Sequence, residues 1–214
     1  MTEAAATDVA LADLVAALAD NKCFLGRRYA EWCTAAPTLE SAVAAAAMAQ
    51  DEIGHARSFY PLLRDLAGAS PETEAETRTA WTNVPFLNVS FRGWTDFVAA
   101  NFLFDTSVSI LLEAATASSF SPLAQRACRI LEEEPLHWLH GEGWTRRLAD
   151  KGQGVRDALI ASFGQVGAQS LEWFACSSTD LVSRDVLSRD PEELRSAFRG
   201  RVNPVLDAAQ LPLI

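Results

Sequence analysis

The residues best suited to chemistry are two Glu-x-x-His pairs, Glu52 with His55 and Glu134 with His137. Each pair lies in a segment whose apolar residues recur every three or four positions, which predicts a helix with one buried face. A carboxylate and an imidazole on such a face cost several kcal/mol to bury unless something binds them. Two pairs on separate helices therefore predict a metal site, with a buried salt-bridge network as the alternative.

Two further polar residues interrupt apolar stripes, Asp105 in a third segment and Lys22 in a first. A helix rises about 1.5 Å per residue. The number of residues between each group and the nearest turn therefore places all six groups at about the same height along the bundle axis. Carboxylates from two helices and Glu-x-x-His from the other two are the ligands of di-iron bundles with the ferritin-like fold. Here a lysine replaces one ligand. The sequence predicts one or two iron ions, or manganese, bound by the other five residues, Glu52, His55, Asp105, Glu134 and His137.

The role of Lys22 stays open at this stage. Three carboxylates and one ammonium would match the charge of one divalent ion, so the lysine could tune charge or transfer protons as a catalytic residue. A neighbouring metal and burial would lower its pKa, which would allow a neutral amine to act as ligand, base or nucleophile. Without metal, three carboxylates would balance Lys22 and two protonated histidines, so neutrality also permits a non-catalytic protein.

The pattern around these residues predicts a single all-α domain over residues 1–214. A polar, proline-containing connection between the second and third helices is typical of a bundle with one long crossover. Pro135 should kink the fourth helix, and Gly54 should mark a close approach between helices. The expected helices are approximately 8–33, 38–66, 95–118, 121–151 and 155–181, followed by a short one opened by a capping box at Asp190 and Glu193.

Composition narrows the class of protein. A net charge of -10 argues against nucleic acid or an anionic membrane as a partner. The sequence has no uninterrupted apolar run of about 18 residues and no basic leader, which predicts a cytoplasmic protein. The four cysteines lack zinc-type spacing and are expected to be reduced thiols.

The motifs resemble those of a known family, the ferritin-like subunits of the ring-epoxidising phenylacetyl-CoA monooxygenase. Trp32, the APTL stretch, QDEIGH, Asp105 and EExxH at 133–137 resemble the catalytic subunit, whereas LADN, EWC and GHARSF resemble its structural companion. The resemblance covers roughly residues 15–150. It implies that the five predicted ligands correspond to iron ligands of the catalytic subunit, and that Lys22 stands where that subunit has a glutamate.

Three functions follow as hypotheses. The first is an oxygenase or oxidase that activates O2 and acts on a small organic molecule, which the resemblance suggests is an aromatic acyl thioester. The second is a non-catalytic structural subunit that pairs with a ferritin-like partner, and a reductase would complete such a system. The third is a lysine-dependent enzyme built on the same bundle. A homo- or hetero-oligomer is expected in the first two.

Overall fold

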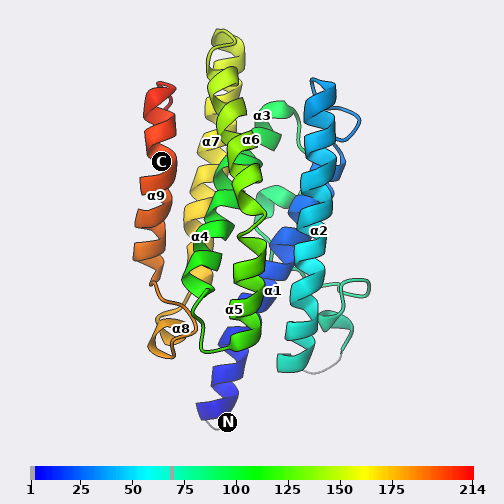
Figure 1. Cartoon of the computed structure of the whole chain (residues 1–214), viewed down its shortest axis with the longest axis vertical. Helices are drawn as coiled ribbons and strands as arrows, with labels where there is room; N and C mark the ends of the chain where they lie inside the picture. The colour runs from blue at the N-terminus through cyan, green and yellow to red at the C-terminus, as the bar shows by residue number, and fades with distance from the viewer. Residues whose placement is uncertain (1–2, 68–69) are drawn as a thin grey trace.

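The computed structural model describes residues 3–67 and 70–214 and contains no strand among them. Four antiparallel helical segments form a bundle (Figure 1). The all-α ferritin-like prediction is confirmed. The four segments are α1 (Glu3–Ala30), α2 (Leu39–Ala67), the run α3 (Trp94–Ala99), η3 (Ala100–Asp105) and α4 (Thr106–Ala115), and the pair α5 (Ser121–Ile130) and α6 (Glu134–Ala149).

Two more long helices, α7 (Gln153–Trp173) and α9 (Pro191–Ala208), pack on the side of the bundle away from α2 (Figure 1). Between them lie a short 3-10 turn, η4 (Phe174–Cys176), and α8 (Thr179–Ser183). The α3–α4 run lies in the middle of the molecule, and almost all of its side chains are buried. Although Trp94–Ala115 is long and apolar enough to cross a membrane, 94% of its most apolar window is covered by the protein itself.

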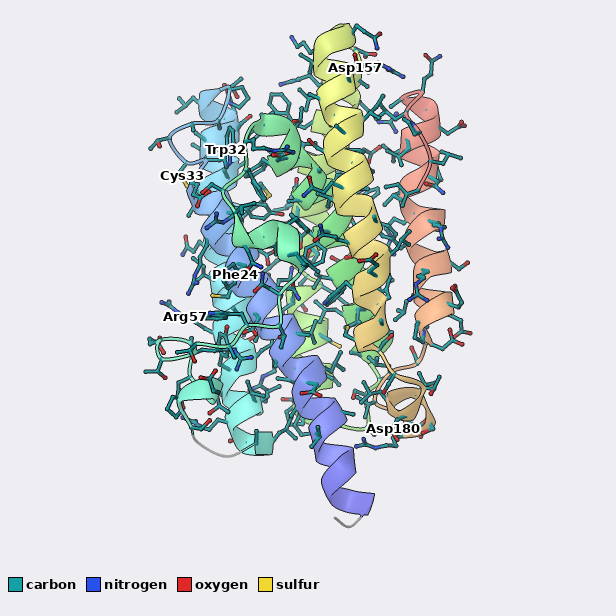
Figure 2. All side chains as sticks on the ribbon, turned by 180° about the vertical axis from the view of Figure 1, so that it is seen from behind. Phe24, Trp32, Cys33, Arg57, Asp157 and Asp180 are labelled. Carbon is teal, nitrogen blue, oxygen red and sulfur yellow. The ribbon has the colours of Figure 1, made fainter. Side chains whose placement is uncertain are left out.

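The crossover between α2 and α3 carries two short turns, η1 (Pro71–Thr73) and η2 (Pro85–Asn88), and is fixed to α1 by one buried carboxylate. Asp20 accepts hydrogen bonds from the Arg78 guanidinium, from the backbone and hydroxyl of Thr82, and from the Tyr60 hydroxyl. Phe24 of α1, visible in Figure 2, packs edge-on against Trp81 at 5.1 Å. These contacts hold the crossover along the bundle, as the sequence predicted.

The predicted helices differ from the observed ones where functional residues lie. The fourth helix is broken by turns at residues 131–133, so the kink predicted at Pro135, in the first turn of α6, is a complete interruption. The third helix contains a π-helical turn, η3, which ends at Asp105. The fifth ends at Trp173 rather than near Leu181. The capping box at Asp190 and Glu193 is confirmed.

Close helix approach occurs at glycines other than the one predicted. A methyl group on Gly54 would meet nothing within 4 Å, so that prediction is wrong. On Gly26 it would lie 2.6 Å from the Ile53 side chain, and on Gly141 it would lie 2.9 Å from the backbone of Phe102. Gly26 therefore brings α1 close to α2, and Gly141 brings α6 close to the π-helical turn.

This packing predicts that Gly141→Ala destabilises the protein by about 1–3 kcal/mol, because backbone atoms of η3 would have to move. Gly143 is the matched control, since a methyl group there has no neighbour within 4 Å. Gly143→Ala should stabilise by up to about 1 kcal/mol through helix propensity. Urea unfolding of the wild type and the two variants measures both changes in stability. Equal changes in the two variants would contradict the close approach at Gly141.

Candidate metal centre occupied by a lysine

An ammonium group lies at the centre of the bundle. Lys22 Nζ donates hydrogen bonds to Glu52 Oε1 at 2.9 Å, Asp105 Oδ1 at 2.8 Å and Glu134 Oε1 at 2.7 Å. Lys22 and Glu52 are fully buried, and Asp105 and Glu134 nearly so. An ammonium has three hydrogens to donate, and here each goes to a carboxylate on a different helical segment. Its hydrogen-bonding capacity is therefore fully used.

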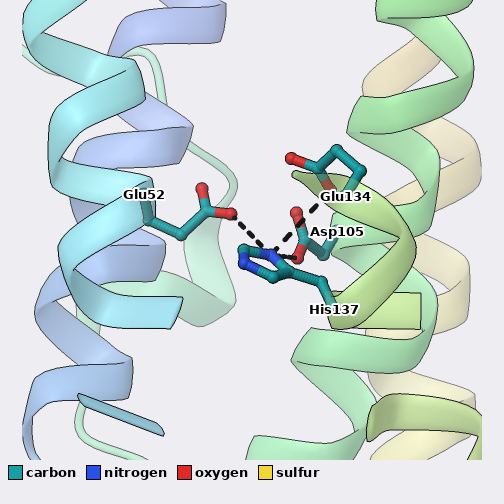
Figure 3. Close-up of side chains that lie close together, drawn as sticks. All are labelled: Glu52, Asp105, Glu134 and His137. Carbon is teal, nitrogen blue, oxygen red and sulfur yellow. Dashed lines mark hydrogen bonds and ion pairs between the residues drawn. The ribbon is translucent and has the colours of Figure 1, made fainter. Parts of the chain in front are cut away.

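A histidine completes the cluster beside the lysine. His137 Nδ1 lies 2.9 Å from Asp105 Oδ2 and 3.3 Å from Glu52 Oε1, and the imidazole sits between the acids of α2 and those of the facing helices (Figure 3). Its Nε2 lies 3.3 Å from Asp51 Oδ2. The Asp51 carboxylate is 39% exposed, so His137 connects the buried acids to the surface.

Irregular backbone positions these groups. Asp105 is the last residue of the π-helical turn, and Glu134 begins α6 directly after the break in the fourth helix. Asn101, within the turn, donates to the backbone carbonyl of His137 at 3.1 Å. Ser109 donates to Glu134 Oε2 at 2.9 Å. The break and the π-helical turn therefore both lie next to the cluster and position its side chains.

The second predicted histidine lies at the edge of the cluster. His55 Nε2 is 2.8 Å from Glu133 Oε2, whose carboxylate is 45% exposed, whereas its Nδ1 is 3.8 Å from Glu134 Oε1 and has no hydrogen-bond partner among the described residues. The structure thus brings five of the six predicted residues into direct contact and turns the imidazole of His55 toward a surface acid.

The charges in the cluster fix the protonation of Lys22. Burial alone would lower its pKa, but the carboxylates of Asp105, Glu134 and Glu52 outweigh burial and hold the pKa well above 10.5. The lysine is therefore an ammonium in this structure. The hypothesis that Lys22 acts as a neutral ligand, base or nucleophile would require the loss of these three contacts.

The other titratable groups of the cluster also have shifted pKa values. Burial opposes ionisation of Asp105, but Lys22 and His137 outweigh it and hold its pKa well below the usual 3.8. Burial lowers the pKa of His137, but the hydrogen bonds that its ring donates to Asp105 and Glu52 outweigh burial and raise the pKa to about 11. Burial and the charge of Asp105 raise the pKa of Glu52 to about 8. Two cations, Lys22 and His137, therefore lie in one layer with three acidic side chains, of which Glu52 takes up a proton more readily than Asp105.

One detail of the predicted charge balance is wrong. Burial and the charge of Lys22 lower the pKa of His55 to about 3, so this histidine is neutral rather than protonated. A neutral imidazole that hydrogen-bonds Glu133 through Nε2 carries its proton on that nitrogen.

The donor set can be compared with that of a metal centre. Glu52, Asp105, Glu134 and His137 each offer an atom within 4.8 Å of the others, which is a spacing compatible with one bound cation. Lys22 Nζ already lies within 2.9 Å of three of these residues. With Lys22 in this position the residues do not fit a dinuclear centre, because the ammonium takes both a ligand position and the place of the cation.

Sequence reasoning missed several residues of this layer. Ser109 and Asn101 occupy apolar-looking stretches, and no spacing marked them. Asp51 lies beside the apolar stripe of its helix rather than within it, but it contacts His137. Tyr29 is fully buried near the three acids, and burial and their charges raise its pKa well above 10.0.

Comparison with known proteins identifies the family. Residues 1–213 match the family model described as phenylacetic acid catabolic protein. The chain belongs to this family. It is also 28% identical over 198 residues to one of the subunits of 1,2-phenylacetyl-CoA epoxidase from Escherichia coli (strain K12), an alignment that covers 91% of this chain and 80% of that relative. The predicted resemblance is confirmed, and the relative is part of an oxidoreductase.

Replacing Lys22 with methionine tests the electrostatic role. Removing one partner of a buried ion network leaves unpaired charges, so Lys22→Met should lower the free energy of unfolding by about 3–5 kcal/mol. Lys151 is the only other lysine and is exposed, and Lys151→Met should change stability by less than about 0.5 kcal/mol. Denaturant unfolding at pH 7 measures both changes in the free energy of unfolding. Similar losses of stability in the two variants would contradict the electrostatic role of Lys22.

The pKa shifts predict how stability depends on pH. The folded protein retains the His137 proton to about pH 11 and the Glu52 proton to about pH 8, whereas their usual pKa values are 6.5 and 4.5. The folded state therefore binds more protons than the unfolded state between pH 6.5 and 8, and stability should fall as pH rises. Each such proton contributes a slope of about 1.4 kcal/mol per pH unit.

His137→Gln should remove a large part of this slope. His140→Gln is a control of opposite sign, because burial lowers the pKa of His140 to about 4 and only the unfolded state binds its proton near pH 6. This variant should make the fall of stability steeper below about pH 7.5 and leave it unchanged above. Unfolding curves collected from pH 6 to 9 measure the slopes. An unchanged slope in the His137 variant would show that this histidine does not hold the extra proton.

Proposed function

We propose that this chain is a metal-free subunit of a multicomponent oxygenase of the phenylacetyl-CoA epoxidase type. Its relative is one subunit of such an epoxidase, which supports assembly with other subunits. The observation that carries the proposal is the Lys22 ammonium, 2.7–2.9 Å from three buried carboxylates. In this proposal, oxygen activation takes place on a ferritin-like partner, and this chain stabilises the assembly.

In this role, the lysine replaces the compensating charge that metal ions supply in a ferritin-like di-iron bundle. Three acids directed at one point repel each other unless a cation lies between them. The ammonium keeps the helices in register without a bound ion. A cytoplasmic location, a hetero-oligomer and an electron-donating reductase remain predictions that accompany this function.

A second candidate function retains catalysis in this chain. Four residues, Glu52, Asp105, Glu134 and His137, already offer ligand atoms within 4.8 Å of each other. If the Lys22 side chain moved aside, these residues and His55 would supply mainly oxygen donors with two imidazoles, a set that suits Fe(II) or Mn(II). Iron bound there would supply the chemistry of O2 activation, and Lys22 would serve as a nearby proton donor.

Metal content separates the two candidates. Wild-type protein purified without oxygen and incubated with Fe(II) or Mn(II) should contain less than about 0.1 ion per chain. The reason is that the Lys22 ammonium already holds the carboxylates that would bind the ion. Lys22→Glu supplies the missing carboxylate and should bind at least about one ion per chain. Lys151→Glu makes the same charge change at an exposed site and should remain free of metal.

Elemental analysis after gel filtration gives these ratios. A stoichiometric ion in the wild-type chain would favour the catalytic candidate and overturn the proposal. A folded Lys22→Glu protein that takes up no ion would show that the lysine is not what keeps metal out.

A further inference from the structure

An apolar patch lies on the outward faces of α2 and α6. Four large apolar side chains of these helices are between 61% and 78% exposed, namely Leu39, Val43, Leu136 and Leu139. Single apolar residues scattered over a surface are common, but several on two neighbouring helices are typical of a surface that another protein covers. We call these four residues and the helix surface between them the α2–α6 patch.

The two helices of the patch run antiparallel beside each other, on the side of the bundle that faces the viewer in Figure 1. Near the start of α2, Glu40 is close enough to Arg147 of α6 for their charges to interact. Further along, Asp51 lies 3.3 Å from His137. These contacts at two heights keep the helices together, so the patch is one continuous surface. It is about 24 Å long and about 20 Å wide, the width of two helices.

Charged residues mark the two ends of the patch on α6. Glu132, just before the helix, and Leu136, Leu139 and Arg147 are separated by three, four and eight residues, so they share one face. Glu132 and Arg147 are exposed, and neither forms an ion pair within the part of the chain that the structure describes. The Arg147 guanidinium lies 4.7 Å from the centre of the Trp144 ring. The patch therefore has an acidic end and a basic end, about 22 Å apart.

We propose that the α2–α6 patch binds a second copy of the same chain in an antiparallel arrangement. A two-fold axis that lies in the plane of the patch and crosses α6 near Leu139 sets each α6 against the other in the opposite direction. Arg147 of each copy then meets Glu132 of the other. Leu136 and Leu139 lie within about 5 Å of the axis along the helix, so the leucines of the two copies pack together at the centre. An apolar centre with a charged rim is the usual arrangement of a protein interface.

The order of the residues favours a second copy over another occupant. A matching helix needs an acid, two apolar residues and a base at the same intervals in reverse, and α6 itself has that order. An anionic lipid surface is disfavoured, because the chain has a net charge of -10. The proposal does not depend on whether the chain binds metal. It leaves α7 and α9, on the side away from α2, free for a different subunit.

The size of the patch sets the expected strength of association. The patch covers about 500 Å², which is less than the roughly 800 Å² per partner of a standard interface. We therefore expect a dimer that dissociates on dilution, with a dissociation constant of about 1–100 µM.

Sedimentation velocity of the full chain from about 1 to 500 µM tests this, in about 0.1 M salt to screen the repulsion between two acidic chains. The mass should rise with concentration from that of one chain to that of two. A wild-type chain that remains a monomer at about 500 µM would overturn the proposal.

Exchanging the two end charges tests the antiparallel arrangement. Glu132→Arg and Arg147→Glu should each weaken dimerisation at least about tenfold, because each places like charges opposite one another in both symmetry-related contacts. The double variant exchanges the charges and should regain most of the lost affinity. Asp207→Arg is the control, since Asp207 is exposed on α9, outside the patch, and its dissociation constant should stay within about threefold of wild type. A double variant that regains no affinity, or equal weakening by the control, would overturn the arrangement.

A charge at the centre of the patch tests its apolar part. Leu136→Glu should weaken dimerisation at least about tenfold, because a carboxylate would be buried beside the leucines of the other copy. Leu213→Glu is the matched control, since Leu213 is 59% exposed near the end of the chain and lies outside the patch. Both side chains are exposed, so the thermal midpoint of the dilute protein should stay nearly unchanged. A Leu136→Glu variant that dimerises as the wild type does would place the contact elsewhere and overturn the proposal.

Discussion

The contact between the Lys22 ammonium and three carboxylates is the interaction on which the bundle depends. Each of the four helical segments supplies one of these charged groups, and all meet in one buried layer. Charges removed from water are tolerated only when they are paired and hydrogen-bonded. A shift of any one helix by a turn, about 5 Å, would leave an unpaired charge in the core. The network therefore fixes the register of the helices, even though its net stabilising energy is small compared with the cost of breaking it.

The irregular features of the fold concentrate at this layer. The π-helical turn ends at Asp105, the fourth segment breaks just before Glu134, and Gly141 lets α6 approach the turn. Such irregularities cost backbone hydrogen bonds and are common at functional sites. Here they orient three acids around the Lys22 ammonium. The donor residues of a candidate metal centre are thus combined with an ammonium in the place of a cation, and this is the observation behind the proposed metal-free role.

The sequence predicted the architecture and the composition of the cluster because both follow from helical periodicity. A polar residue in an apolar stripe must be paired, and counting along the helices predicted that all six groups could meet, whereas the structure brings together five of them and leaves His55 at the edge. Helical periodicity does not predict the direction of the His55 imidazole or the contact of Asp51 with His137, because both depend on side-chain torsions. It does not predict the π-helical turn either, because that turn depends on local backbone hydrogen bonds. The prediction at Gly54 was wrong for a related reason. Propensity marks a glycine as costly in a helix but does not say whether its open side faces a neighbour or a cleft.

The protonation of Lys22 tests the central claim most directly. The chain has only two lysines, so labelling lysine side chains with ¹⁵N gives one signal from Lys22 and one from exposed Lys151. The three carboxylates hold the pKa of Lys22 well above 10.5, and its signal should stay that of an ammonium at a pH where Lys151 has begun to titrate. A Lys22 signal that titrates below that of Lys151, or that is broadened by bound iron in the anaerobically loaded protein, would contradict the account.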